Sequence, residues 1–167
     1  MIWILLALAI TLPFAVAALT GAPWLPTLNP QTTAALDLAD LKPGQTIIDL
    51  GSGDGRLLKA AAKRGLNAIG YEINPYMYLI SLAATFRYRR RVKIHLADFW
   101  TAKLPEADVI YVFLLPKLMS KLDAKLTAEL TRPTTVISLA FEIPTRRPNA
   151  NIGSVRSYCF DPITRLT

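Results

Sequence analysis

The sequence predicts an α/β fold with a mostly parallel sheet, preceded by a hydrophobic N-terminal helix. Two observations support this prediction. Short β-branched apolar runs alternate with segments rich in Ala, Leu and Lys, which is typical of strands followed by helices. The first 36 residues contain no charged side chain, and residues 2–19 are nearly all aliphatic. With 167 residues, the chain is long enough for one domain with a buried core.

Residues 1–22 are expected to form a transmembrane anchor. Trp3 and Trp24 bracket an uncharged segment. On a helix rising about 1.5 Å per residue their indoles would stand about 30 Å apart, the thickness of a hydrocarbon core. A cleaved signal peptide is one alternative, although no basic residue precedes the apolar run. A soluble or partner-binding helix is the other. The Lys- and Arg-rich remainder of the chain favours the cytosolic side of a membrane.

Residues 23–45 are expected to form a linker and a leading helix. Three prolines within residues 23–30 interrupt the N-terminal helix. An amphipathic helix is then predicted over residues 32–41. The turn formed by residues 42–44 leads into the first strand, so the main domain is expected over residues 46–167.

The rest of the chain is organised around residues 46–56. Residues 46–50 predict a buried strand, Gly51, Gly53 and Gly55 a sharp turn, and residues 57–64 a helix. Glycines at alternate positions let the backbone bend and approach a ligand closely. The helix N-terminus adds free N–H groups that point at the turn. This arrangement predicts a nucleotide-binding site.

Acidic side chains are expected at the ends of three successive strands. Asp49 lies in the first run, Glu72 ends the run over residues 68–72, and Asp98 follows the next run; Asp54 lies within the glycine turn. The chain has neither a G-x-G-x-x-G motif nor a P-loop. Acids would repel a pyrophosphate but suit a ligand with ammonium and sulfonium groups, such as S-adenosylmethionine, with Glu72 on its ribose. The alternative is that these acids are ordinary turn residues.

The second half of the chain continues the alternation of strands and helices. Residues 107–115 are continuously apolar, which predicts a central strand. A helix over residues 116–130 and a strand over residues 134–141 follow. Beyond them, only residues 154–160 have the pattern of a strand, so shortened C-terminal strands are expected. The helical stripe expected to face the core consists of Leu118, Leu122, Leu126 and Leu130.

The predicted second helix, beginning at Asn74-Pro75, ends in a cluster of cations. Tyr76, Leu79, Ile80, Ala83 and Phe86 would share one of its faces. The cations are Arg87, Arg89, Arg90, Arg91 and Lys93. Two interpretations remain open for them: a solvated helix end favoured by the helix dipole, or contact with phospholipid headgroups. Nucleic acid is a weaker third interpretation.

Composition excludes several other classes of protein. The net charge of +7 favours an anionic partner without choosing between membrane and nucleic acid. Cys159 is the only cysteine, which excludes an intramolecular disulfide, and it is expected to be a packing residue. His95 is the only histidine and is expected in the core or at a sheet edge. No metal-ligating cluster is present in the sequence.

These motifs resemble those of the class I (seven-β-strand) S-adenosylmethionine-dependent methyltransferases. They are most similar to a family of small membrane-anchored protein-lysine methyltransferases. Its mitochondrial members modify the adenine nucleotide translocase and the c-ring protein of ATP synthase. The resemblance implies a Rossmann-like sheet and a methyltransferase domain over residues 46–167. The matching segments are residues 49–56, 70–75, 98–100, 113–116 and the upstream segment 23–27.

The resemblance also implies a substrate class and a set of site residues. The acceptor is expected to be a lysine of a membrane-associated protein. The alternatives are a small-molecule or lipid methyltransferase and a non-catalytic module that binds adenosyl ligands. Because residues 113–116 lack the polar Asn/Asp-Pro-Pro-Tyr motif, DNA adenine methylation is disfavoured. No catalytic residue and no metal ligand is identified. The expected cofactor-binding residues are Asp49, Gly51, Ser52, Gly53, Asp54, Gly55, Glu72, Asp98 and Phe99, with Trp100, Phe113 and Pro116 expected on the acceptor side.

Overall fold

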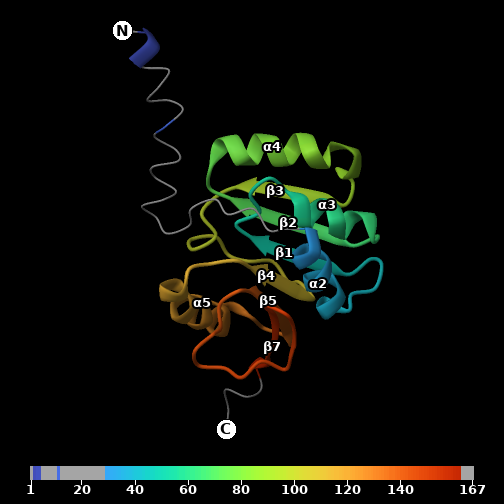
Figure 1. Cartoon of the computed structure of the whole chain (residues 1–167), viewed down its shortest axis with the longest axis vertical. Coiled ribbons are helices and arrows are strands. Elements are labelled where there is room, and N and C mark those ends of the chain that lie inside the picture. The colour runs from blue at the N-terminus through green and yellow to red at the C-terminus, as the bar shows by residue number, and fades with distance from the viewer. Residues whose placement is uncertain (1, 5–10, 12–28, 163–167) are drawn as a thin grey trace.

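The computed structural model describes residues 2–4, 11 and 29–162, and residues 29–162 contain one sheet covered by helices (Figure 1). Within this part of the chain the sheet has seven strands in the order β3-β2-β1-β4-β5-β7-β6. Strands β1 to β5 run parallel, while β7 is antiparallel to both β5 and β6. The strands are β1 (Thr46–Leu50), β2 (Asn67–Glu72), β3 (Val92–Leu96), β4 (Val109–Val112), β5 (Thr134–Leu139), β6 (Ala150–Ile152) and β7 (Val155–Phe160).

Helices cover both faces of the sheet and enclose two cores. The helices are α2 (Asn29–Ala39), α3 (Arg56–Lys63), α4 (Pro75–Thr85), the short 3-10 helix η1 (Phe86–Tyr88) and α5 (Pro116–Glu129). Side chains alternate along each strand, so neighbouring residues of β1 enter different cores. Ile47 packs in the core with α2 and α3, whereas Ile48 packs in the core with α5. This alternation confirms that the central strands are buried on both sides.

Most of the predicted elements are present, with differences at the sheet edges. Leu122, Leu126 and Leu130 of the α5 stripe are buried, as predicted. Strand β6 was not predicted, because its three residues are all exposed and show no apolar pattern. The prediction for Cys159 was wrong: it lies on β7 with its side chain directed to solvent.

The N-terminal anchor cannot be compared with the structure. Residues 5–10 and 12–22, which make up most of the expected anchor, lie outside the described residues, as do residues 23–28 of the expected linker. Among the described residues, no helix has both the length and the apolar character needed to cross a membrane.

Candidate cofactor site

The turn between β1 and α3 has the backbone conformation that its glycines predict. Gly51, Gly53 and Gly55 have φ angles of 95°, 53° and 77°, in the left-handed region that favours glycine. The backbone N–H groups of Gly51 and Ser52 both donate to the Tyr71 carbonyl at 2.9 Å, which ties the turn to β2. A Cβ placed on Gly51 would meet no atom within 4 Å. The turn therefore leaves open space against its own backbone, which suits a ligand.

Glu72 is buried at the end of β2 and braces the glycine turn. Its Oε2 accepts a hydrogen bond from the Gly53 backbone N–H at 2.8 Å, and its Oε1 accepts one from Asn74 at 2.7 Å. Each carboxylate oxygen has two acceptor positions, so each retains one. Two acceptors side by side fit the two hydroxyls of a ribose.

Asp49 is almost fully buried, with 4% of its surface exposed. Burial, and then the charges of Glu72 and Asp54, raise the pKa of its carboxyl group to about 8. The ionised form of Asp49 thus lacks compensating charge in this structure. A cationic group that entered the site would supply that charge, which is a physical reason for the site to prefer a positively charged ligand.

Asp54 has a partner within the turn. Its Oδ2 lies 2.5 Å from Nη2 of Arg56, and the hydrogen bond from Arg56 holds the pKa of Asp54 below its usual value. Arg56 is the first residue of α3. Asp54 is therefore placed in the turn as expected, but its charge is largely balanced by Arg56 and is less available to a ligand.

Asp98, Phe99 and Trp100 follow β3 in a loop. Oδ1 of Asp98 accepts a hydrogen bond from the Trp100 backbone N–H at 2.9 Å. Phe99 is buried in the core beside α5, and its ring centroid lies 4.6 Å from that of Trp100. Nζ of Lys121 lies 4.3 Å from the centre of the Trp100 ring. The structure thus gives Phe99 and Trp100 a packing role in addition to any contact with a ligand.

Lys125 of α5 fixes this loop from below. Its buried Nζ donates to the carbonyl oxygens of Ala102 at 2.9 Å and Trp100 at 3.4 Å, and it pairs with Glu129. Because backbone carbonyls of the loop are held by a charged donor, Asp98 and its neighbours are held close to β3 without a helix of their own.

The candidates on the acceptor side lie at the carboxyl end of β4. Phe113 follows the strand directly, and its ring stacks on Phe141 with centroids 6.4 Å apart. Pro116 is exposed at the first position of α5. Phe113 packs against the core on the α2 and α3 face, whereas Trp100 packs against the α5 core. The three acceptor-side candidates therefore lie at one edge but on different faces of the sheet.

Two residues at this edge were missed in the sequence. Asn74 is buried and caps α4, because its side chain accepts from the Tyr76 backbone N–H at 2.9 Å while its own N–H donates to Glu72. The Asn-Pro pair at a helix start was the available signal. Ile73, which lies between Glu72 and Asn74, is 43% exposed and offers apolar surface beside the ribose acceptors.

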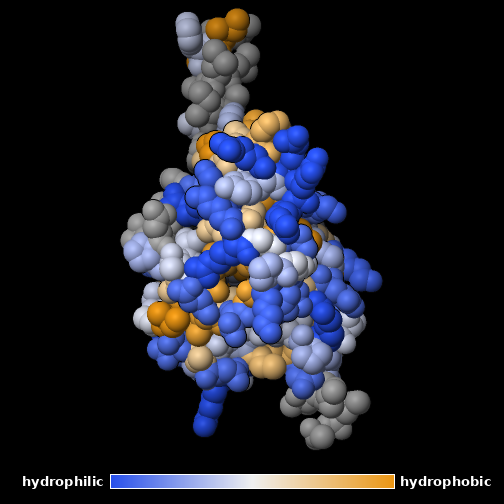
Figure 2. Space-filling view, turned by 90° about the vertical axis from the view of Figure 1, so that its right-hand side faces the viewer, coloured by the Kyte–Doolittle hydropathy of each residue, from blue (hydrophilic) through white to orange (hydrophobic). Residues whose placement is uncertain are grey.

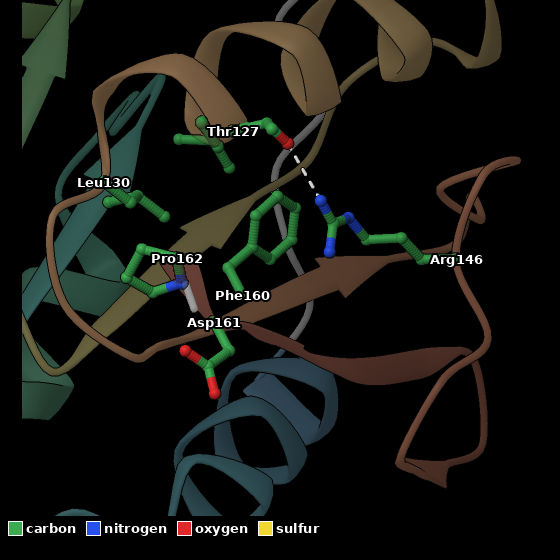
Figure 3. A pocket seen from close by; sticks show the side chains of 7 residues that line it. Thr127, Leu130, Arg146, Phe160, Asp161 and Pro162 are labelled. Atoms are coloured by element: carbon green, nitrogen blue, oxygen red, sulfur yellow. Dashed lines mark hydrogen bonds between the residues drawn. The ribbon is translucent and has the colours of Figure 1, made fainter. Parts of the chain in front are cut away.

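A separate pocket of about 210 Å³ lies at the opposite edge of the sheet (Figure 3). Phe160, in its wall, pairs with Thr134, the first residue of β5, so the pocket is at the amino end of the parallel strands. Arg146 donates to Thr127 at 2.8 Å and lies 3.7 Å above the Phe160 ring. Because its polar groups already contact one another, and it is remote from the three acids, this pocket is not the predicted site.

The fold and the site together define a class of enzyme. A glycine turn after β1, acids at the ends of β1, β2 and β3, and a final antiparallel strand are those of a class I S-adenosylmethionine-dependent methyltransferase. A solved RNA methyltransferase from Salinibacter ruber in complex with S-adenosyl-L-homocysteine is similar, with a TM-score of 0.74 and 29% identity over 82% of this chain and 93% of that one. A methyltransferase from Thiobacillus denitrificans, also with S-adenosyl-L-homocysteine, shares the fold at a TM-score of 0.56 and 20% identity over 66% of this chain and 48% of that one.

The family is narrower than the class. Residues 49–150 match the family model of the ANTKMT methyltransferase domain, and the chain belongs to that family. The Rattus norvegicus lysine N-methyltransferase named for the c-type subunit of ATP synthase is 30% identical over 87% of this chain and 68% of its own length. The adenine nucleotide translocase lysine N-methyltransferase of Mus musculus is 38% identical over 74% of this chain and 55% of its own length.

A third relative is closer to this chain in length. A protein-lysine N-methyltransferase of Saccharolobus islandicus (strain REY15A) is 34% identical over 72% of this chain and 78% of its own length. These comparisons confirm three predictions: the family, an enzyme of the methyltransferase class, and S-adenosyl-L-methionine as the cofactor.

Proposed function

We propose that this chain transfers a methyl group from S-adenosylmethionine to a lysine side chain of a membrane-associated protein. The observation that carries the proposal is the match over residues 49–150, which includes all three acids and the carboxyl end of β4. The relatives from Rattus norvegicus, Mus musculus and Saccharolobus islandicus are named as lysine methyltransferases. The first two are named for acceptors that are membrane proteins.

The residues present fit the cofactor group by group. Glu72 would accept from the ribose hydroxyls through its two remaining acceptor positions, and Asp98 from the adenine amino group. Ile73 would provide apolar surface for the adenine ring. Asp49 would balance the ammonium group of the cofactor, whose arrival supplies the missing positive charge. The complete proposed set is Asp49, Gly51, Ser52, Gly53, Asp54, Gly55, Glu72, Ile73, Asp98 and Phe99.

The acceptor side is proposed to act by exclusion of water and by orientation. The bound cofactor supplies an activated methyl group on a sulfonium. Phe113, Pro116 and Trp100 are apolar, and they would remove water from an entering lysine and so favour its neutral, nucleophilic form. The lysine gives up its proton to solvent before attack, and the new N–C bond forms as the S–C bond breaks. The contribution of the protein is then position and desolvation, without a dedicated base.

The remainder of the chain is proposed to bring the domain to a membrane. Residues 1–22 would form a single transmembrane anchor, residues 23–45 a linker and leading helix, and residues 46–167 the methyltransferase domain on the cytosolic side. The uncharged segment between Trp3 and Trp24 supports the anchor. Release of the full chain by carbonate at high pH, as for a peripheral protein, would contradict it.

The acceptor can be tested directly. Membrane proteins from cells with and without this chain are compared by mass spectrometry, and the purified enzyme is offered membrane protein, RNA and lipid with radiolabelled cofactor. A lysine mark that disappears without the enzyme, and with the Glu72→Ala variant in its place, supports the proposal. Ser120→Ala, a change at an exposed position of α5, is the matched control. Labelling of RNA or lipid without labelling of lysine would refute the lysine assignment.

A further inference from the structure

Helix α4 presents its hydrophobic side chains to the surface and its small polar side chains to the core. Met77, Ser81 and Thr85 are the residues of α4 that are buried. The face opposite to them carries large apolar side chains that no other described residue covers. These are Leu79, Ile80 and Leu82 with exposures of 59%, 47% and 39%, and Phe86 at the start of η1 with 63%.

The buried face explains why the helix packs this way. A Cβ on Gly55 would lie 2.2 Å from Oγ of Ser81, so α4 approaches the start of α3 at a distance that only small residues permit. Thr85 satisfies its hydroxyl by donating to the Ser81 carbonyl at 2.7 Å. Close packing of small residues holds α4 in place, and its apolar face is left without a role in the fold.

A cluster of cations adjoins this apolar face. It consists of Arg87, Arg89, Arg90, Arg91 and Lys93, and the sequence has no acidic residue between Glu72 and Asp98. Among the described residues, none of the five cations takes part in an ion pair. The guanidinium of Arg89 lies 4.8 Å from the centre of the Phe86 ring, so charge and apolar surface are in contact. Figure 2 shows hydrophobic side chains at the top of the domain, where α4 lies, beside a group of hydrophilic ones.

We propose that this face, formed by Leu79, Ile80, Leu82, Phe86 and the adjoining cations, docks on an anionic lipid bilayer. An amphipathic helix that lies in the interface buries its apolar stripe at the headgroup boundary and places its cations on lipid phosphates. The absence of acids makes the face complementary to an anionic surface. A second copy of the chain fits less well, because a symmetric contact through this face would bring the two cation clusters together.

Docking would also place the cofactor site. Helix α4 begins at Pro75, two residues after Ile73 and directly after Asn74, whose backbone N–H is bonded to Glu72. The start of the docked helix is thus joined to the edge of the sheet that carries the acids. With α4 on the bilayer, this edge lies beside the headgroups, within reach of acceptors at the membrane surface.

The test measures where the face lies in the full-length protein. A Cys159→Ser chain carries one spin label at Leu82→Cys and is reconstituted in vesicles of phosphatidylcholine, with or without phosphatidylglycerol. In anionic vesicles the label is expected to lose accessibility to a water-soluble nickel chelate and to gain accessibility to oxygen. The matched control, Ser120→Cys on α5, is expected to remain accessible to nickel in both. Binding of S-adenosylhomocysteine verifies the fold of each variant.

The role of the cations is tested in the same assay. Neutralising Arg87, Arg89 and Arg90 to glutamine should lower the docking equilibrium about fivefold per arginine, and high salt should act in the same direction. A Leu82 label that stays equally accessible to nickel in anionic and neutral vesicles would overturn the proposal. Equal protection in both vesicles, unaffected by the three glutamines, would overturn it as well, because another segment, a second copy or another protein would then cover the face.

Discussion

Binding of the cofactor is expected to release close to one proton from Asp49 at neutral pH. Burial and the charges of Glu72 and Asp54 raise its pKa to about 8. At pH 7 such a group is about 90% protonated, whereas the ammonium of the bound ligand stabilises the carboxylate. About 0.9 proton should therefore leave for each ligand bound. The same reasoning lowers the apparent affinity at pH 7 about tenfold relative to the ionised protein, or about 1.4 kcal/mol.

The measurement is isothermal titration calorimetry with S-adenosylhomocysteine between pH 6 and pH 9. Two buffers of different ionisation enthalpy are compared at each pH, which yields the number of protons exchanged. The ligand's own α-amino group titrates near pH 8. For that reason the Asp49→Asn variant, which keeps the shape of the side chain, supplies the baseline. Equal proton release by the wild type and by this variant would refute the reasoning.

The same group makes the stability of the ligand-free protein depend on pH. Its folded-state pKa lies above the ordinary value of 3.8, so the native state retains a proton that the unfolded state loses. The contribution of Asp49 is complete below about pH 4 and is lost as pH rises through about 8, at up to about 1.4 kcal/mol per unit. Denaturant unfolding at several pH values should show this decline in the wild type and a flatter curve in Asp49→Asn. Parallel curves would argue against a raised pKa.

Three further substitutions test the site and its supports. Glu72→Ala should weaken cofactor binding by about 1–3 kcal/mol, through loss of charge-assisted hydrogen bonds, and undiminished affinity in calorimetry would remove Glu72 from the site. Gly55→Ala should lower the free energy of unfolding by about 2–4 kcal/mol, from backbone strain and overlap with Ser81. In a Ser81→Gly background the loss should shrink, and an unchanged loss would exclude the overlap. Lys125→Met should cost about 2–4 kcal/mol in urea unfolding, while the exposed Lys117→Met should cost less than about 0.5 kcal/mol; similar costs would contradict the role of Lys125 in holding the loop.

The cofactor edge was predictable because its determinants are local. The run Thr46–Leu50 followed by alternate glycines specifies a strand and a turn within a few residues. Parallel strands place their carboxyl ends at one edge, so the acids at the ends of β1 and β2 and after β3 had to meet there. Neither step requires knowledge of how distant segments pack.

The features that escaped prediction depend on contacts between distant segments. The apolar stripe of α4 was visible in the sequence, but which face is buried is decided by the approach of Gly55 to Ser81. Whether Cys159 faces the core or solvent depends on the register of β7 against β5. The pairing of Asp54 with Arg56 is close in sequence but requires the actual turn conformation. In each case the deciding term is tertiary geometry, which neither composition nor spacing encodes.

The bracing of the glycine turn by Glu72 has a consequence for how the enzyme responds to its product. Because Gly53 and Asn74 are already bonded to the carboxylate, ribose and adenine meet a preformed surface and little ordering accompanies binding. S-adenosylmethionine and S-adenosylhomocysteine are identical in those parts and differ in one methyl group and the sulfonium charge. A site organised around the shared parts holds both ligands with similar strength. Turnover then follows the ratio of the two ligands in the cell, so the enzyme responds to the methylation potential more than to the supply of methyl donor alone.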